Sequence, residues 1–272
     1  MGGARWEAGG GGGWGGDAVR VGAAGAGRGG AALRAEAGGA AAAALRAEGG
    51  RVSTAPQGAG VLLLHPHPGL GGSMHFPPVE ALFHEMVASP AFDLVVRYNM
   101  RGAGGSGGRL SLWGGQDIAD LREVSALLHG YVARLYLVGY SWGSCVAAGA
   151  LGEAGVAGYV GVSFPAGWLP SVFLGARRHL RACLSSPLPK FFLHGTRDNF
   201  TSPRRMRGLM QRCSADTGEN GAHGGAQEDL SFLYEEWDTD HFWYGREGEM
   251  ACSVRRWIEK LEVPARPGPA GL

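Results

Sequence analysis

The sequence lacks a long apolar run, an excess of charge and paired cysteines. No stretch approaches about 18 consecutive apolar residues, so we expect no membrane-spanning helix. The formal net charge is only +1, which argues against nucleic acid as a partner. The cysteines include no Cys-x-x-Cys pair, which argues against a zinc site and is typical of a reducing compartment such as the cytoplasm. They are Cys145, Cys183, Cys213 and Cys252.

The first part of the chain also lacks a hydrophobic pattern. Residues 1–56 consist largely of glycine and alanine, and the whole chain holds 50 glycines. Such a composition can bury little apolar surface, so we expect a low-complexity, disordered segment. Its arginines would suit an organelle-targeting peptide, but its acidic residues and its scarcity of serine oppose that alternative. We place one folded domain at residues 57–263 and a Pro/Gly-rich, flexible tail at residues 264–272.

From residue 57 onward, short apolar runs alternate with amphipathic segments of helical periodicity. The runs have the length and continuity of strands that are buried on both faces. This alternation predicts a mostly parallel sheet with right-handed crossovers and helices on both faces. Ligands of such sheets bind beyond the carboxyl ends of the strands, so the functional residues are expected in loops that follow strands. The predicted strands are Val61–Leu64, Asp93–Tyr98, Leu135–Val138, Tyr159–Phe164, Lys190–His194 and Phe232–Trp237.

One of these loops, Gly139–Gly143, has the pattern Gly-x-Ser-x-Gly. It lies between a predicted strand and a predicted helix, which is the context of a nucleophile elbow. The sharp turn exposes the hydroxyl of Ser141, and the glycines on either side relieve crowding. The N-terminus of the following helix favours negative charge, as the stabilisation of an oxyanion requires. At this point an ordinary Gly/Ser turn of an α/β protein is the alternative.

A nucleophilic serine needs a base, and the base needs a carboxylate that orients it. Asp198 follows the strand at Lys190–His194, and His241 follows the strand at Phe232–Trp237. With Ser141, they occur in the chain order Ser, Asp, His that is typical of α/β-hydrolases. Asp238 and Asp240 lie near the histidine and are rival acids, but the chain order favours Asp198.

The oxyanion needs two backbone N–H donors, of which one is expected at Trp142, the residue after the nucleophile. The second is expected in the loop after the first strand of the domain. Pro66 and Pro68 have no N–H, which leaves His67 or, as the less favoured alternative, Gly69. Glycine at position 69 would also let a substrate approach the backbone of the cleft closely.

The histidines of the same loop do not indicate a metal site. His65 and His67 are two residues apart and His75 is nearby, but no carboxylate or cysteine accompanies them in a diagnostic spacing. We therefore predict neither a metal nor a cofactor, and we expect His65 to brace the loop through hydrogen bonds.

Taken together, the motifs resemble those of the small α/β-hydrolases related to dienelactone hydrolase. The resemblance covers about residues 58–262 and implies a three-layer α/β-hydrolase fold. It also implies that Ser141 is the nucleophile, His241 the base and Asp198 the acid, and it names a reaction class without a substrate. The motifs are His65–Pro68 (HPHP) with Gly71–Met74 (GGSM), Tyr98–Ser106 (YNMRGAGGS), Gly139–Ser144 (GYSWGS), His194–Asp198 (HGTRD) and Asp240–Trp243 (DHFW).

The chain departs from this family at its beginning. The family usually has an antiparallel pair of strands before the HPHP loop. Here the candidates for such strands are Val19–Val21 and Leu45–Val52, inside the low-complexity segment. Without them, the sheet would lack one edge.

About 25 residues separate the strands at 159–164 and 190–194, which leaves no room for a large cap domain. We therefore expect an open cleft bordered by aromatic side chains that could bind an apolar or aromatic group, although tryptophans also pack in protein cores. The residues expected to border it are Trp142, Trp168, Phe242 and Trp243, together with Gly69.

These observations predict a serine hydrolase that cleaves carboxylic esters through an acyl-enzyme formed with a small-molecule acyl substrate. Two alternatives stay open: a non-catalytic binding protein with the same fold, and an acyltransferase that uses the same three residues. The sequence does not decide the substrate or the oligomeric state.

Overall fold

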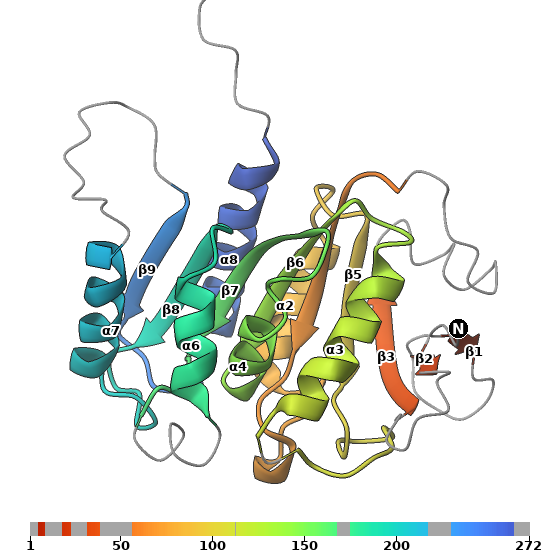
Figure 1. The fold of residues 1–272 in the computed structure, drawn as a ribbon, viewed down its shortest axis with the longest axis horizontal. Helices are drawn as coiled ribbons and strands as arrows, with labels where there is room; N and C mark the ends of the chain where they lie inside the picture. The colour runs from red at the N-terminus through yellow and green to blue at the C-terminus, as the bar shows by residue number, and fades with distance from the viewer. Residues whose placement is uncertain are drawn as a thin grey trace, which may run out of the picture.

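The computed structural model describes residues 5–8, 18–22, 32–38, 56–111, 113–167, 175–216 and 230–263. In this part of the chain, nine strands form one sheet in the order β1-β2-β3-β5-β4-β6-β7-β8-β9 (Figure 1). The strands are β1 (Arg5–Ala8), β2 (Ala18–Gly22), β3 (Ala32–Gly38), β4 (Ala59–Leu64), β5 (Leu94–Asn99), β6 (Arg134–Tyr140), β7 (Val156–Val162), β8 (Lys190–Gly195) and β9 (Phe232–Trp237). The helices are α2 (Pro77–Val87), α3 (Gly115–Leu128), α4 (Trp142–Ala148), α6 (Ala176–Leu184), α7 (Pro203–Asp216) and α8 (Glu247–Glu262), with a 3₁₀ turn η1 (Pro68–Leu70).

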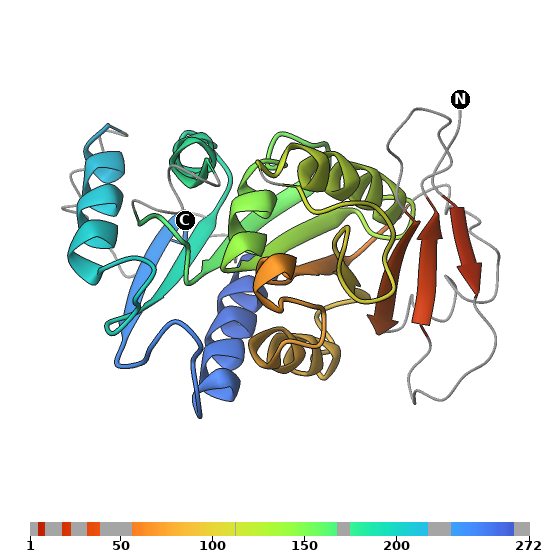
Figure 2. The ribbon, with the colours of Figure 1, turned by 90° about the horizontal axis from the view of Figure 1, so that it is seen from below.

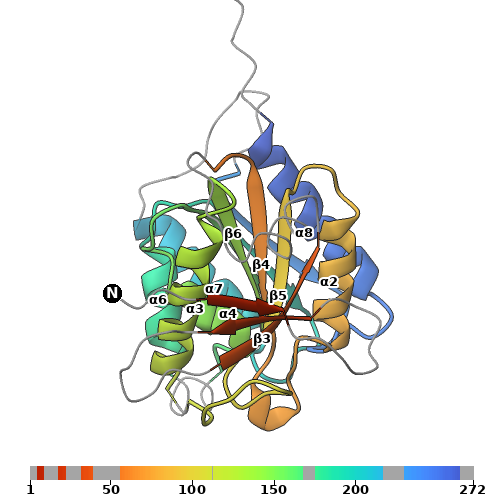
Figure 3. The ribbon, with the colours of Figure 1, turned by 90° about the vertical axis from the view of Figure 1, so that its right-hand side faces the viewer.

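All six predicted strands are present as β4 to β9, and they pair in parallel. Strands β4, β5 and β8 are buried along their whole length, as their continuous apolar runs predict. Helices cover both faces of the sheet. Helices α2 and α8 pack on one face, and α3, α4, α6 and α7 pack on the other (Figure 3).

The strand order places two functional loops side by side. After β4 the chain first forms β5 on one side of it and then crosses to form β6 on the other side. The order therefore reverses at β4, and a crevice forms there beyond the carboxyl ends of the strands. The loop after β4 and the turn after β6 meet at this crevice, because Leu64 lies beside Gly139 in the paired strands.

Three further strands lie within residues 1–56, where the composition predicts disorder. β1, β2 and β3 are antiparallel, and β3 pairs with the edge of β5 (Figure 2). Strand β2 contains the segment Val19–Val21 that the sequence offers as a family remnant, whereas Leu45–Val52 and the tail 264–272 lie outside the described residues. Backbone hydrogen bonds to β5 explain how a segment with few apolar side chains joins the sheet. The domain boundary at residue 57 stays a prediction.

The pattern misplaces several strand boundaries by one or two residues, and the largest difference lies at the start of β7. β7 begins at Val156, three residues before the predicted Tyr159, because the parallel pairing with β6 begins at Leu135 and continues past a register shift. Of the three added residues, Ala157 and Gly158 are not typical of strands, so Val156 alone carries a strand signal. Among the described residues, no helix has both the length and the apolar character needed to cross a membrane.

Candidate active site

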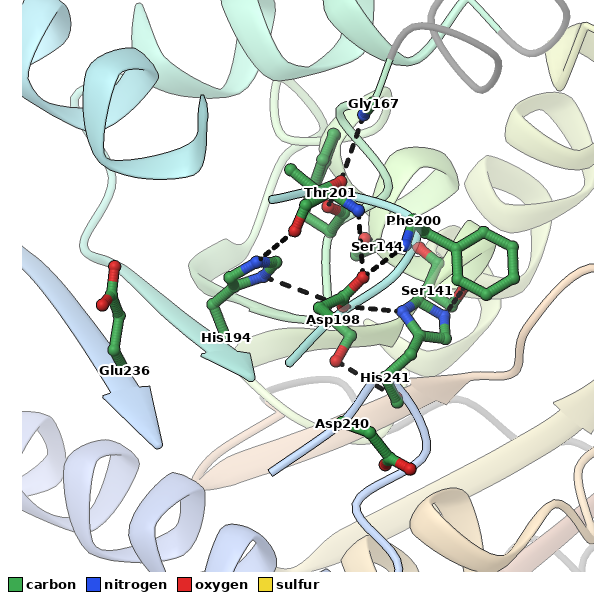
Figure 4. Close-up of polar contacts among 12 residues, drawn as sticks. Ser141, Ser144, Gly167, His194, Asp198, Phe200, Thr201, Glu236, Asp240 and His241 are labelled. Carbon is green, nitrogen blue, oxygen red and sulfur yellow. Dashed lines mark hydrogen bonds and ion pairs between the residues drawn. The ribbon is translucent and has the colours of Figure 1, made fainter. Parts of the chain in front are cut away.

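Three loops bring Ser141, His241 and Asp198 together at the carboxyl ends of the parallel strands. Ser141 follows β6, Asp198 follows β8 and His241 follows β9. His241 Nε2 lies 3.0 Å from Ser141 Oγ, and His241 Nδ1 lies 2.7 Å from Asp198 Oδ2 (Figure 4). The carboxylate and the imidazole are almost fully buried. The three side chains thus form a hydrogen-bonded chain from a hydroxyl through a histidine to a carboxylate.

Ser141 lies on a strained turn that only close backbone packing can hold. Its φ of 52° and ψ of −118° are unusual for a residue with a side chain. A methyl group on Gly139 would lie 2.4 Å from the backbone of Gly143, and one on Gly143 would lie 2.4 Å from the carbonyl oxygen of Leu64. Both glycines are therefore required by contact, as the elbow pattern predicts.

The structure distinguishes Asp198 from its rivals. One oxygen of Asp198 accepts the N–H groups of Phe200 and Thr201 at 2.7 and 2.9 Å, which leaves the other oxygen for His241. Asp238 is instead paired with Arg197 on the surface. One carboxylate oxygen of Asp240 accepts the N–H groups of two residues that follow it, so it stabilises its own turn. Of these carboxylates, Asp198 is therefore the one that can orient the imidazole.

The backbone of His241 is held by hydroxyl groups that sequence reasoning did not identify. Its carbonyl oxygen accepts hydrogen bonds from Tyr140 Oη at 2.6 Å and from Ser163 Oγ at 3.3 Å. The indole N–H of Trp243 donates to the same Ser163 Oγ at 2.9 Å. Burial raises the pKa of Tyr140 well above its usual range, so this hydroxyl keeps its proton and stays a donor. Of the two hydroxyl residues, Tyr140 lies inside the Gly-x-Ser-x-Gly motif, whereas Ser163 belongs to no motif that could have identified it.

Thr201 connects the loop that carries Asp198 to the loop after β7 and to the end of β8. Its hydroxyl donates to Phe164 O at 3.0 Å and accepts the N–H of Gly167 at 3.1 Å. Its carbonyl oxygen lies 2.8 Å from His194 Nε2, at the end of β8. His194 is fully buried with its other ring nitrogen 3.9 Å from Asp198, and burial lowers its pKa, so the ring is neutral. These contacts fix the loop on which Asp198 lies.

Two loops beside Ser141 carry the backbone N–H groups that are candidates for binding an oxyanion. The N–H of Trp142 is the first of α4 and has no acceptor within the helix. On the opposite loop, the N–H of Gly69 donates to His67 Nδ1 at 3.1 Å, so it is already engaged. This contact leaves the N–H of His67 as the better candidate for the second donor, and that role stays a prediction.

His65 braces the same loop, as expected. Its Nδ1 donates to Pro66 O at 2.6 Å, and its Nε2 accepts the N–H of Met100 at 2.8 Å. Both ring nitrogens are thus engaged, and burial lowers the pKa of His65 to about 4. The side-chain oxygen of Asn99, beside Met100, accepts the N–H of Met74 at 2.8 Å. The loop after β5 therefore supports the loop after β4.

A buried ion pair anchors the loop after β5 to α3. Arg101 donates two hydrogen bonds to Asp120, at 2.6 and 2.8 Å, and both side chains are almost fully buried. Asp117 lies on the same buried face of α3, and burial together with the Asp120 carboxylate raises the pKa of Asp117 to about 7. Among the described residues, no cluster of His, Cys, Asp and Glu side chains could hold a metal ion.

Two tryptophans predicted to border the cleft do not do so. Trp243 is fully buried, and its indole packs in the core between the sheet and α8. Trp142 is 1% exposed, with its ring in the core on the opposite face. Phe242 is half-buried with its ring beside His241, while Trp168 lies outside the described residues. Phe200 was missed by sequence reasoning, and its ring lies 4.2 Å from that of His241.

Several solved structures share this fold. An α/β serine hydrolase homologue from Coxiella burnetii is 19% identical, with 83% of this chain and 91% of that chain covered and a TM-score of 0.59. A serine hydrolase without a lid from Xanthomonas campestris is 18% identical, with coverage of 87% and 92% and a TM-score of 0.62. The esterase Pf2001 from Pyrococcus furiosus is 19% identical, with coverage of 74% and 81% and a TM-score of 0.55. The chain matches no protein-family model and no curated protein.

At these identities, the likeness establishes the fold alone. Together with the parallel sheet and its two helical layers, it shows that the chain has an α/β-hydrolase fold without a large cap domain, as predicted. The closer relation to dienelactone hydrolase stays a prediction.

The close packing around Gly143 predicts that a larger residue at this position destabilises the protein. Gly143→Ala should lower the free energy of unfolding by about 1–3 kcal/mol, because the new methyl group meets backbone atoms that cannot move aside. Gly152→Ala is the matched control, since a methyl group there has nothing within 4 Å. Urea unfolding of both variants measures the difference. Equal stability of the two variants would contradict the close packing.

The low pKa of His65 predicts a pH dependence of stability. The folded protein takes up this proton near pH 4, whereas the unfolded chain takes it up near pH 6.5. The contribution of His65 to the free energy of unfolding is therefore complete above about pH 6.5. It falls by about 3 kcal/mol in total as the pH drops toward 4.

Urea unfolding at pH 4 to 7 should show this loss in the wild type and not in His65→Asn. Other histidines whose pKa is lowered, such as the half-buried His129 and the buried His194, titrate in both proteins and cancel in the comparison. Parallel pH curves for the two proteins would contradict the prediction.

Proposed function

We propose that this protein is a serine hydrolase that cleaves carboxylic esters of small molecules. The observation that carries the proposal is the hydrogen-bonded chain Ser141–His241–Asp198, with distances of 3.0 and 2.7 Å, on a strained nucleophile turn. The esterase from Pyrococcus furiosus, which has a similar fold, supports the reaction class.

Acylation begins when Ser141 Oγ attacks the carbonyl carbon of the ester. His241 Nε2 accepts the hydroxyl proton, and the carboxylate of Asp198 holds the Nδ1–H tautomer and stabilises the imidazolium. Negative charge develops on the carbonyl oxygen, which accepts hydrogen bonds from the N–H groups of Trp142 and His67. His241 then gives the proton to the departing alkoxide oxygen, and the alcohol leaves.

Deacylation reverses these roles with water as the nucleophile. His241 Nε2 takes a proton from the water that attacks the acyl-enzyme, and Ser141 Oγ leaves with that proton. The deep burial of Asp198 and its two backbone N–H donors keep the carboxylate oriented through both steps. The open, capless architecture gives water direct access to the acyl-enzyme.

Labelling with a fluorophosphonate probe tests the nucleophile. The wild type should become covalently labelled, and Ser141→Ala should not, because the reacting oxygen is gone. Ser253→Ala is the control, since Ser253 lies on α8 away from the site. An unlabelled wild type, or equal labelling of Ser141→Ala, would contradict the proposal and favour a non-catalytic binding protein.

The choice of acid is tested separately. Asp198→Asn should lower kcat/KM for a short-chain ester by roughly 10³- to 10⁴-fold, because the amide no longer stabilises the required tautomer or the imidazolium. Asp238→Asn should change kcat/KM little, since Asp238 is on the surface with Arg197. Steady-state kinetics measure both variants. A larger loss of kcat/KM in Asp238→Asn than in Asp198→Asn would contradict the choice of Asp198 and identify Asp238 as the acid.

A further inference from the structure

An aromatic cluster lies directly beside the imidazole of His241. The ring of Phe200 covers the imidazole, with 4.2 Å between centroids. Phe242 meets the same imidazole edge-on at 5.5 Å and meets Phe200 edge-on at 6.5 Å. Tyr244 lies 5.5 Å from Phe242 and extends the cluster outward. We name Phe200, Phe242 and Tyr244 the aromatic cluster.

The cluster is partly exposed to solvent, whereas Trp243 of the loop after β9 is buried in the core. Phe200 is 36% exposed and Tyr244 is 72% exposed, and Phe242 is half-buried. Trp243, between two members of the cluster, is fully buried and bonded to Ser163. The rings of the cluster therefore leave apolar surface open at the catalytic histidine, where a ligand can cover it.

Two equivalent turns hold the phenylalanines in place. The carboxylate of Asp198 accepts the N–H groups two and three residues later, and the carboxylate of Asp240 does the same. Phe200 and Phe242 each lie two residues after the aspartate of their turn. Both rings are thus presented from fixed backbone, so a ligand would bind a preorganised surface.

The chemistry of the proposed reaction determines which half of an ester lies here. His241 Nε2 must give its proton to the leaving oxygen, so that oxygen lies within hydrogen-bond reach of the imidazole. The carbonyl oxygen instead faces the N–H groups of Trp142 and His67. The alcohol half of the ester therefore passes beside the imidazole, which Phe200 covers.

We propose that the aromatic cluster binds the alcohol half of the substrate and selects esters of aromatic alcohols. This inference rests on the proposed function. Offset and edge-to-face stacking on Phe200 and Phe242 favours a flat aromatic ring over a linear alkyl group of similar reactivity. The exposed ring of Tyr244 extends the contact to a larger alcohol.

The test compares esters that share an acetyl group and differ in the alcohol. Benzyl and propyl acetates have leaving alcohols of similar acidity, so the ratio of their kcat/KM values reports binding of the alcohol half. In the wild type this ratio should be roughly tenfold or more, as expected for covering one aromatic ring. A wild-type ratio near one, with esters still cleaved, would overturn the subsite and leave the proposed function intact.

Two variants locate the effect. Phe200→Ala should bring the benzyl-to-propyl ratio close to one, and Tyr244→Ala should lower it by a smaller factor. Tyr244 touches neither Ser141 nor His241 through a hydrogen bond in the structure, so its variant keeps the test valid even where Phe200→Ala folds poorly. Leu70→Ala, an exposed residue on the opposite loop, is the matched control and should leave the ratio unchanged.

Other outcomes separate competing explanations. If Phe200→Ala lowers kcat/KM equally for both esters, Phe200 only positions His241, and the subsite is overturned. If acetylcholine is cleaved faster than its neutral isostere 3,3-dimethylbutyl acetate, the cluster binds a cation instead, and the aromatic-alcohol inference is overturned. A wild type that is neither labelled by the fluorophosphonate probe nor active on any ester would overturn the proposed function and this inference with it.

Discussion

The close approach of the elbow to β4 is the constraint on which the site depends. A Cβ on Gly143, in the first turn of α4, would lie 2.4 and 2.7 Å from the carbonyl oxygens of Leu64 and His65, so only glycine allows this approach. This contact fixes the distance between the turn that carries Ser141 and the loop after β4, which carries the proposed second oxyanion donor. The unusual backbone of Ser141 costs about 1–3 kcal/mol, and its N–H bond to Val162 O and the buried sheet around it hold it in place.

On the other side of the nucleophile, rigidity comes from hydrogen bonds rather than packing. Tyr140 and Ser163 hold the backbone of His241, and Thr201 ties the acid loop to β8 and to the loop after β7. Each of these buried hydroxyls has a partner, so none carries the cost of an unsatisfied polar group. The imidazole and the carboxylate are therefore held in alignment, so the proposed reaction would need little reorganisation as charge develops.

The sequence predicts the parallel sheet and the three polar loops because both leave local signals. Strands that are buried on both faces are continuous apolar runs, and Ser141, Asp198 and His241 each follow one of them. The N-terminal strands leave no such signal, since β3 joins the sheet through backbone hydrogen bonds to β5. Partners far apart in the chain are equally hidden: Tyr140 and His241 are separated by 101 positions.

The sequence also does not predict which aromatic side chains of a loop are buried and which are exposed. Sequence cannot tell that Trp243 turns inward, because that depends on its left-handed backbone, with a φ of 60°, inside the turn held by Asp240. The same turn leaves Phe242 beside His241. Asp198 and Asp240 thus perform the same local task, and only Asp198 has its second oxygen on the imidazole. One type of turn therefore positions both the Asp198 carboxylate and the aromatic rings, so the rings can change without altering the hydrogen-bonded chain they border.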